Sequence, residues 1–368
     1  MADHVAVVGA GAVGVTAAVD LASGGASVTL FDRDEPGSGA SGRAAGIVYD
    51  AFADRRDAQI AQRALERFFE LADRDAIDLV RTPYVWLARD GDERRADAIR
   101  EQVPRMREHG CRVSLLDPAA LGERFPTLET DDVVVAAVAE NAGVLSPETY
   151  VETMAARARV AGVTLRPNVE VSVREGGVVE TSDGTESFDA VLVAAGAHTK
   201  RVLADAGVPI PMKPYRVQAL VTEQFPDVPT LYDASGEYYL RPKGGGLLVG
   251  DGTEPVEADP DDYDRSGDAA FESDAVASVE RATGIEPEIR RSWAGLCTAT
   301  PDRDPLLGRV DDGLYVATGW HGHGFMRAPA LGEAVAAEIR GGVGIPSFDP
   351  GRFDGDESFE VVEGMAIE

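Results

Sequence analysis

The sequence predicts an α/β protein in which a domain built on a parallel sheet is joined to an α+β domain built on an antiparallel sheet. Residues 4–34 alternate an apolar strand, a glycine-rich turn, an apolar helix and a second strand. A second glycine-rich turn that leads into a helix lies at 313–339. Between them, PMKPYRVQALVT, EYYLRP and GGLLVG, within 211–250, are strand-forming runs broken by glycine and proline. The 368 residues suffice for two domains.

The composition indicates a globular protein with a strongly acidic surface. Hydrophobic residues make up 44% of the chain, and 64 acidic against 35 basic residues give a net charge of −29. This charge excludes a nucleic-acid binder with a basic surface and disfavours anionic membranes. The only lysines are Lys200, Lys213 and Lys243. The imbalance resembles proteins of salt-loving archaea, so we expect a halophilic protein whose stability rises with KCl.

The cysteines and the N-terminus indicate a reducing compartment. Cys111 and Cys297 cannot supply a disulfide framework for a chain of this length. The first residues, Met-Ala-Asp-His, lack the positive charge of a signal peptide, and the apolar run that follows ends at Asp20, before it could span a bilayer. We therefore expect a cytoplasmic protein that neither inserts into membranes nor binds nucleic acid.

Residues 4–34 have the pattern of a dinucleotide-binding unit. Gly9 and Gly11 leave the turn without side chains, so that backbone N–H groups can approach a pyrophosphate, and Gly14 lets the helix pack closely on the strand. The helix N-terminus presents its positive dipole end to the phosphates. Asp32 closes the second strand, where its carboxylate would bind a ribose. The pattern alone suits NAD and FAD equally.

The segment after the second strand points to flavin. GSGASGRAAGIV, residues 37–48, resembles the corresponding segment of the D-amino acid oxidase, glycine oxidase and sarcosine oxidase family of FAD enzymes. Residues 162–199 are similar to that family's strand ribbon and its return to the sheet. Residues 293–308 and 313–339, with the tail FDPGRF, are similar to its C-terminal flavin-binding signature.

The resemblance implies a Rossmann-like FAD domain of the glutathione-reductase type, formed by residues 1–80, 145–210 and 290–368. The substrate domain would comprise 81–144, which includes a solvated helix, and 211–289. The FAD would be held non-covalently, because Gly295 occupies one attachment position of the relatives and 37–48 contains no histidine. The residues expected at the cofactor are Gly9, Gly11, Ala12, Val13, Gly14, Asp32, Arg33, Ser41, Gly42, Arg43, Ala45, Gly46, Val169, Ala195, Gly196, Leu296, Gly322, His323, Gly324, Phe325 and Met326.

The stretch GWHGHGFM, residues 319–326, allows two interpretations. A metal site would need His321 and His323 to converge with a third ligand, but His4, His109 and His198 are the only other histidines and no CxxC or HExxH pattern is present. We therefore expect no metal. In the flavin interpretation, the glycines bring backbone N–H groups and a helix N-terminus to the flavin ring, where negative charge develops on reduction. His323 matches the family pattern, whereas His321 would face solvent.

The resemblance implies oxidation of an amino acid or N-alkyl amino acid at its C–N bond, by hydride transfer from Cα to flavin N5 to give an imine. Two substrate anchors of the relatives are replaced: Cys297 stands for an arginine and Met326 for a lysine. Arg216, Arg241 and Arg327 are candidates for binding a substrate carboxylate. Tyr239 matches a tyrosine that faces substrate in sarcosine oxidases. The expected catalytic residues are Tyr239, Arg241, His323, Met326 and Cys297, and no general base is identified.

Other functions remain open at this stage. Leu248 replaces a lysine that promotes reaction with oxygen in sarcosine oxidases, which favours a dehydrogenase with another electron acceptor. The same hydride geometry would serve a 2-hydroxy acid dehydrogenase. A flavoprotein that has lost turnover and acts in assembly or interaction is the alternative outside enzymes.

Overall fold

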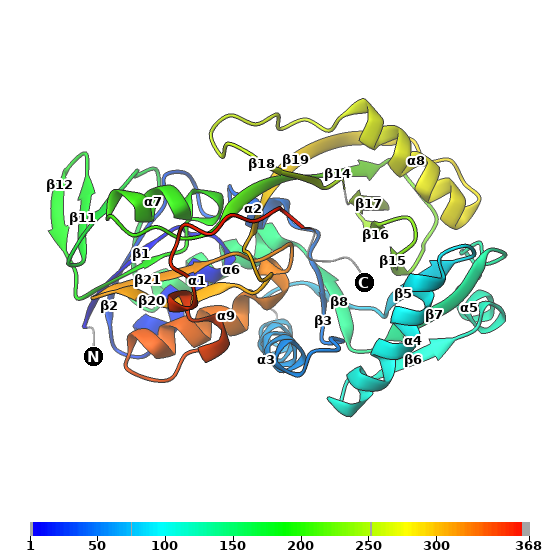
Figure 1. Cartoon of the computed structure of the whole chain (residues 1–368), viewed down its shortest axis with the longest axis horizontal. Coiled ribbons are helices and arrows are strands. Elements are labelled where there is room, and N and C mark those ends of the chain that lie inside the picture. Colours follow the sequence, from blue (N-terminus) through cyan, green and yellow to red (C-terminus); the bar gives the residue numbers. More distant parts are fainter. Residues whose placement is uncertain (1–2, 75, 251, 363–368) are drawn as a thin grey trace.

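The computed structural model describes residues 3–74, 76–250 and 252–362, so both extreme ends of the expected FAD domain lie outside the described residues. A six-stranded sheet forms one half of the molecule (Figure 1). Its strand order is β20 (Leu306–Asp311), β21 (Leu314–Thr318), β13 (Ala190–Val193), β1 (His4–Val8), β2 (Ser27–Phe31) and β9 (Thr164–Arg166). All neighbours pair in parallel except β20, which is antiparallel to β21.

This sheet is the middle of three layers. On β1, Val5 and Val7 pack toward helices α1 (Ala12–Ser23), α6 (Pro147–Val160) and α9 (Gly324–Ile339). Ala6 and Val8 face the opposite layer, made of β10 (Ser172–Arg174), β11 (Val178–Thr181), β12 (Gly184–Ser187), the 3-10 turn η1 (Gly196–His198) and α7 (Thr199–Asp205). A strand covered on both faces must be continuously apolar, which explains the sequence of β1. Each fully buried valine contributes about 1.5–3 kcal/mol to stability.

The other half is a nine-stranded, mainly antiparallel sheet. Its main order is β18 (Glu254–Glu257), β14 (Lys213–Thr222), β17 (Gly246–Gly250), β16 (Tyr238–Lys243), β15 (Thr230–Asp233), β5 (Tyr84–Arg89), β7 (Val133–Ala139) and β6 (Val113–Leu116), and β19 (Ile289–Ala299) also pairs with β14. The three strands expected within 211–250 are therefore confirmed as β14, β16 and β17. The sequence analysis missed β15, a short strand between them.

Helices cover this sheet and connect it to the first half. Helices α4 (Glu93–Glu108), α5 (Pro118–Arg124) and α8 (Ala269–Thr283) pack on the sheet. Helix α3 (Arg55–Ala72) packs mainly on α9 of the first half. Helix α4 is the solvated helix expected in 81–144, with Ala96, Ile99 and Val103 on its buried side. The connecting region contains α2 (Ala40–Arg43) and the sheet of β3 (Ile47–Tyr49), β8 (Ala142–Leu145) and β4 (Leu79–Arg81), and the 3-10 turns η2 (Pro346–Phe348) and η3 (Pro350–Arg352) follow α9.

The two sheets confirm the predicted fold class, an α/β fold with a second α+β half. Strand β19 begins the third segment expected in the FAD domain, yet it pairs along its length with β14 of the antiparallel sheet. The domain boundaries stay a prediction. Within the described residues, none of the helices combines the length and the apolar character needed to span a bilayer.

Candidate active site

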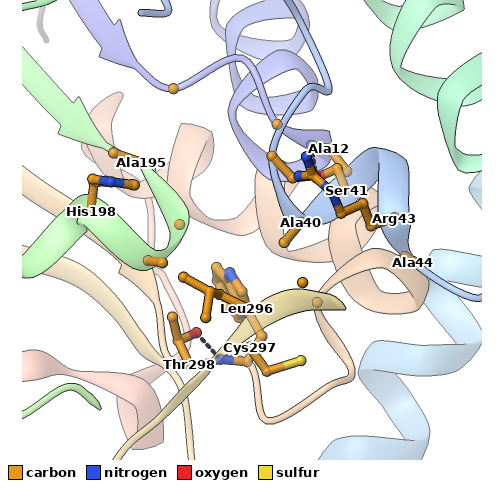
Figure 2. A pocket seen from close by; sticks show the side chains of 18 of the residues that line it. Ala12, Ala40, Ser41, Arg43, Ala44, Ala195, His198, Leu296, Cys297 and Thr298 are labelled. Atoms are coloured by element: carbon orange, nitrogen blue, oxygen red, sulfur yellow. Dashed lines mark hydrogen bonds between the residues drawn. The ribbon is translucent and has the colours of Figure 1, made fainter. Parts of the chain in front are cut away.

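A cavity of about 510 Å³ lies between the two halves and brings distant segments together. Its lining includes Asp32, Arg33 and Val169, which the sequence assigns to the cofactor, and Tyr239 and Met326, which it assigns to the substrate side. Figure 2 shows Ala12, Ser41 and Arg43 on one side and Leu296 to Thr298 of β19 across from them, with Ala195 and His198 at another edge. Its volume falls within the range of small-molecule and cofactor sites.

The first turn is held by its glycines and by Asp32. Gly9 has a φ of +108°, and a Cβ there would overlap the carbonyl oxygen of Ala194. The Asp32 carboxylate accepts hydrogen bonds from the backbone N–H groups of Ala10 at 2.7 Å and Asp34 at 2.9 Å. Burial nevertheless raises the pKa of Asp32. Gly14 does not line the cavity, because it packs against the carbonyl oxygen of Gly9, as expected for a glycine that permits close approach.

Two helix N-termini point into the cavity. Gly11 precedes α1 and His323 precedes α9, and neither cap position provides a side-chain hydrogen bond within the part of the chain that the structure describes. The Ala12 N–H donates a hydrogen bond to Ser41 Oγ at 2.9 Å. Neither helix carries an acidic residue in its first turn. Such ends are ready sites for anionic groups. A cavity with two such helix N-termini suits a dinucleotide that has an anionic pyrophosphate and, at its other end, a ring that gains negative charge. The residues present therefore fit FAD.

The sequence as a whole matches a known family. The model described as "DAO: FAD dependent oxidoreductase" matches residues 4–338. The chain belongs to this family. Its cofactor is therefore FAD and its class is oxidoreductase, which confirms the family, cofactor and enzyme class predicted from the sequence.

Several relatives match over nearly their full length. The chain is 28% identical over 371 residues to glycine oxidase of Pseudomonas putida, covering 95% of this chain and 97% of the relative. It is 26% identical over 360 residues to monomeric sarcosine oxidase of a Bacillus species, covering 90% of each. The crystal structure of L-proline dehydrogenase from P. horikoshii matches with a TM-score of 0.88 and 28% identity, over 96% of this chain and 98% of that one.

The glycine-rich segment 37–46 forms the wall opposite β19. The Arg43 guanidinium donates to the carbonyl oxygens of Ser38 at 2.7 Å and Gly39 at 3.0 Å, which fixes the segment as it bends around the cavity. Gly42 does not line the cavity, since its N–H bonds the Gly37 carbonyl oxygen at 3.0 Å. The expected cofactor residues that do line the cavity are Gly9, Gly11, Ala12, Val13, Asp32, Arg33, Ser41, Arg43, Ala45, Gly46, Val169, Ala195, Gly196, Leu296, Gly322, Gly324, Phe325 and Met326.

The two histidines of GWHGHGFM are both buried. His321 is 3% exposed, and its Nε2 is bonded by the Thr300 N–H at 2.8 Å and lies 3.0 Å from Thr300 Oγ1. The expectation that His321 faces solvent was therefore wrong. Its ring ties the loop to the end of β19, and burial lowers its pKa to about 4.

His323 lies beside the cavity without lining it. Its ring packs edge-on against Phe52 with 5.6 Å between centroids, and burial holds its pKa well below the usual range. The cavity is lined instead by its neighbours Gly322 and Gly324. The described residues contain no group of three or more His, Cys, Asp or Glu side chains that could hold a metal ion.

Strands β14 and β19 provide the wall at the substrate end. Their register places Tyr215 opposite Cys297, Val217 opposite Gly295 and Ala219 opposite Trp293, and all six residues line the cavity. The sequence singled out only Cys297 and Gly295 among them. Alternation along a strand would have predicted that Tyr215, Val217 and Ala219 share a face, but not that this face turns toward the cofactor.

Aromatic side chains complete this end. Tyr239 lies across the neighbouring strand, because a Cβ on Gly250 would overlap its hydroxyl. Tyr49 and Tyr84 line the cavity with ring centroids 4.7 Å apart. The sequence analysis missed both, although Tyr49 closely follows the glycine-rich segment in a short strand, which was a usable signal.

The three candidate arginines all lie outside the cavity lining. Arg216 is bonded in a bidentate manner to Asp268, at 2.9 and 3.0 Å. Arg327 donates to Asp57 at 3.3 Å and stacks on Phe52. Each therefore already has a carboxylate partner, which argues against either as the substrate anchor.

Arg241 is the exception among the candidates. It is 5% exposed and donates to the backbone carbonyls of Ala45 and Pro242, and no ion pair joins it to another described residue. Desolvation lowers its pKa to about 10. It lies directly behind the cavity wall, because Ala45 lines the cavity and Arg241 does not. Leu248, opposite Arg241 on β17, is fully buried and also outside the lining.

Proposed function

We propose that this protein oxidises the C–N bond of an amino acid, preferentially an N-alkyl amino acid, with FAD as the electron acceptor. The family supports a flavin oxidoreductase, and the related glycine oxidase and sarcosine oxidase are named for an amino acid and an N-methyl amino acid. Bound FAD would supply the hydride-accepting ring, and the residues of this chain would orient the substrate carbon toward it.

The proposal rests on the aromatic wall at the substrate end. Tyr49, Tyr84, Tyr239 and Trp293 line it together with Cys297 and Met326. Aromatic rings contact alkyl groups on nitrogen favourably. A desolvated aromatic wall also favours the neutral amine, the form from which hydride can leave, without a dedicated general base.

The substrate carboxylate would be bound without a direct arginine partner. Tyr239 is held in place over Gly250, so we assign its hydroxyl the role of hydrogen-bond donor to the carboxylate. Arg241 would act from behind the wall as a positive charge in a dry environment, where electrostatic interactions are strong. The residues in contact with substrate would be Tyr239, Cys297 and Met326.

The apolar residue at position 248 also favours a dehydrogenase. Leu248 is buried and apolar, and by resemblance it replaces the lysine that promotes reaction with oxygen in sarcosine oxidases. Arg241 is shielded by the 37–46 segment. Reduced enzyme mixed with air in a stopped-flow instrument should reoxidise slowly and should react faster with an artificial acceptor. Rapid reoxidation by air would overturn the dehydrogenase assignment while leaving the oxidation of amines intact.

Anaerobic bleaching of the bound flavin tests the function itself. Sarcosine, N-methylalanine, proline and glycine should bleach the flavin, with secondary amines faster than glycine, whereas lactate and glycolate should not. Tyr239→Phe should raise the substrate concentration for half-maximal bleaching by about tenfold, the loss of one hydrogen bond to a charged group. Bleaching by hydroxy acids alone would favour the hydroxy acid alternative, and no bleaching by either class would favour a non-catalytic flavoprotein.

A further inference from the structure

The connection between β18 and α8 lies along the cavity although it belongs to the half with the antiparallel sheet. We propose that residues 258–268, here called the strap, form part of the cofactor site and retain the adenosine half of FAD. Pro260, Asp261, Tyr263 and Arg265 of the strap all line the cavity. This inference rests on the FAD dependence of the family and is independent of the substrate.

One end of the strap is fastened to the FAD half by two carboxylates, chiefly that of Asp261. Asp261 Oδ1 accepts from Arg33 at 3.2 Å and lies 2.9 Å from His198 Nε2, and its other oxygen accepts from Arg201. Arg201 also donates to Asp259 at 2.7 Å. Arg33 follows Asp32, the expected ribose ligand, and His198 and Arg201 lie on the segment after β13, so these contacts surround the adenosine end.

The other end of the strap is anchored to the antiparallel sheet by a buried residue. Arg216 of β14, 6% exposed, donates to the carbonyl oxygens of Asp264 at 2.8 Å and Ser266 at 2.6 Å and binds the Asp268 carboxylate. The Ala294 N–H of β19 donates to the Arg265 carbonyl oxygen at 2.8 Å. This explains what Arg216 does in place of binding substrate.

The two anchors differ in strength. Arg216 is buried, so its hydrogen bonds exchange poorly with water, whereas Asp261, Arg33 and Arg201 are all more than a third exposed. Exposed ion pairs are individually weak and are screened by salt. The strap would therefore open at its Asp261 end, swing on its Arg216 end and uncover the adenosine half of the cofactor. The Asp261 cluster sets how often that happens.

Salt separates this local effect from the stability of the whole protein. Screening relieves repulsion among the surface carboxylates, so KCl should raise the melting temperature. The same screening weakens the Asp261 cluster, so KCl should speed FAD release from the folded holoenzyme. If FAD were released only by global unfolding, KCl would raise the melting temperature and slow FAD release. A rise in both the melting temperature and the release rate therefore points to local opening.

The test is the rate of FAD release from the holoenzyme, followed by the fluorescence of the freed flavin, at KCl concentrations where the protein stays folded. Asp261→Asn should release FAD about tenfold faster than wild type at the lowest salt, as expected for losing several exposed charge-assisted bonds. Its rate should also depend less on KCl. Asp261→Glu should restore most of the retention, because the charge is kept.

A matched control removes a similar exposed pair outside the cavity lining. Glu140 bonds Arg124 in a bidentate manner, at 2.8 and 2.9 Å, and neither residue lines the cavity. Glu140→Gln should release FAD at the wild-type rate. Equal release rates for Asp261→Asn and wild type, with the variant folded as judged by its melting temperature, would overturn the proposal, and so would an equal acceleration in Glu140→Gln.

Discussion

The buried His321 should make the protein lose stability as the pH falls below neutrality. Burial lowers its folded pKa from 6.5 to about 4, so the unfolded chain binds a proton at a higher pH than the native state does. Stability from this group is therefore complete above pH 6.5 and is lost as the pH falls toward 4. The shift corresponds to about 3 kcal/mol in full, of which about 2 kcal/mol would be lost between pH 7.5 and pH 5.

The measurement is the free energy of unfolding in urea at several pH values, for wild type and His321→Gln. Glutamine can accept the bond from the Thr300 N–H but does not titrate in this range. Other groups contribute to the pH dependence of both proteins; His323, for example, has the same sign. The difference between the two profiles isolates His321. Parallel profiles from pH 7.5 to pH 5 would refute the reasoning, whatever the absolute stability of the variant.

Four further outcomes are expected. Gly9→Ala should abolish FAD binding and cost about 1–3 kcal/mol in backbone strain alone. Gly25→Ala, also at positive φ but with no described atom within 4 Å of its Cβ, should retain FAD. Equal FAD content in the two variants would contradict the overlap with Ala194. Gly250→Ala should displace the Tyr239 ring and lower kcat/KM. In a double-mutant cycle with Tyr239→Phe, the losses in kcat/KM should be far from additive. Additive losses would show that the two residues act separately. The melting temperature should rise from low to molar KCl, and a flat profile would reject the halophilic interpretation. Acid precipitation should release the flavin into the supernatant, and colour in the pellet would indicate a covalent link.

The cofactor half could be predicted because its chemistry constrains contiguous sequence. A backbone that approaches a pyrophosphate needs glycine at fixed spacings, and those spacings are visible without a structure. The predicted residues that do not line the cavity are informative. Gly14 and Gly42 pack the backbone behind the lining, and His323 packs behind the glycines that do line it. A pattern of residue types identifies the segment at a cofactor but does not separate the residues that contact it from those that support it.

The substrate half could not be predicted to the same depth because strand direction decides which side chains reach it. In the segment YRVQA, alternation puts Tyr215 and Val217 on one face and Arg216 on the other, and a one-residue change of register would exchange them. The sequence made Arg216 a candidate substrate-binding residue because a cation suits a carboxylate. The structure instead turns Tyr215 and Val217 to the cavity and gives Arg216 to the strap.

The same difficulty applies to every arginine in so acidic a chain. With 64 carboxylates in the chain, an arginine can find a carboxylate partner in many places, and only the tertiary arrangement shows which arginines do so. Arg241 is buried with backbone carbonyls as its hydrogen-bond partners, and in the proposed function its charge would also act on what lies beyond Ala45. A cation held behind a thin backbone wall attracts an anion without contacting it, and it does so more strongly in a dry site than at a surface. Recognition of a small substrate would then rest on aromatic contacts for the amine and on a shielded positive charge for the acid.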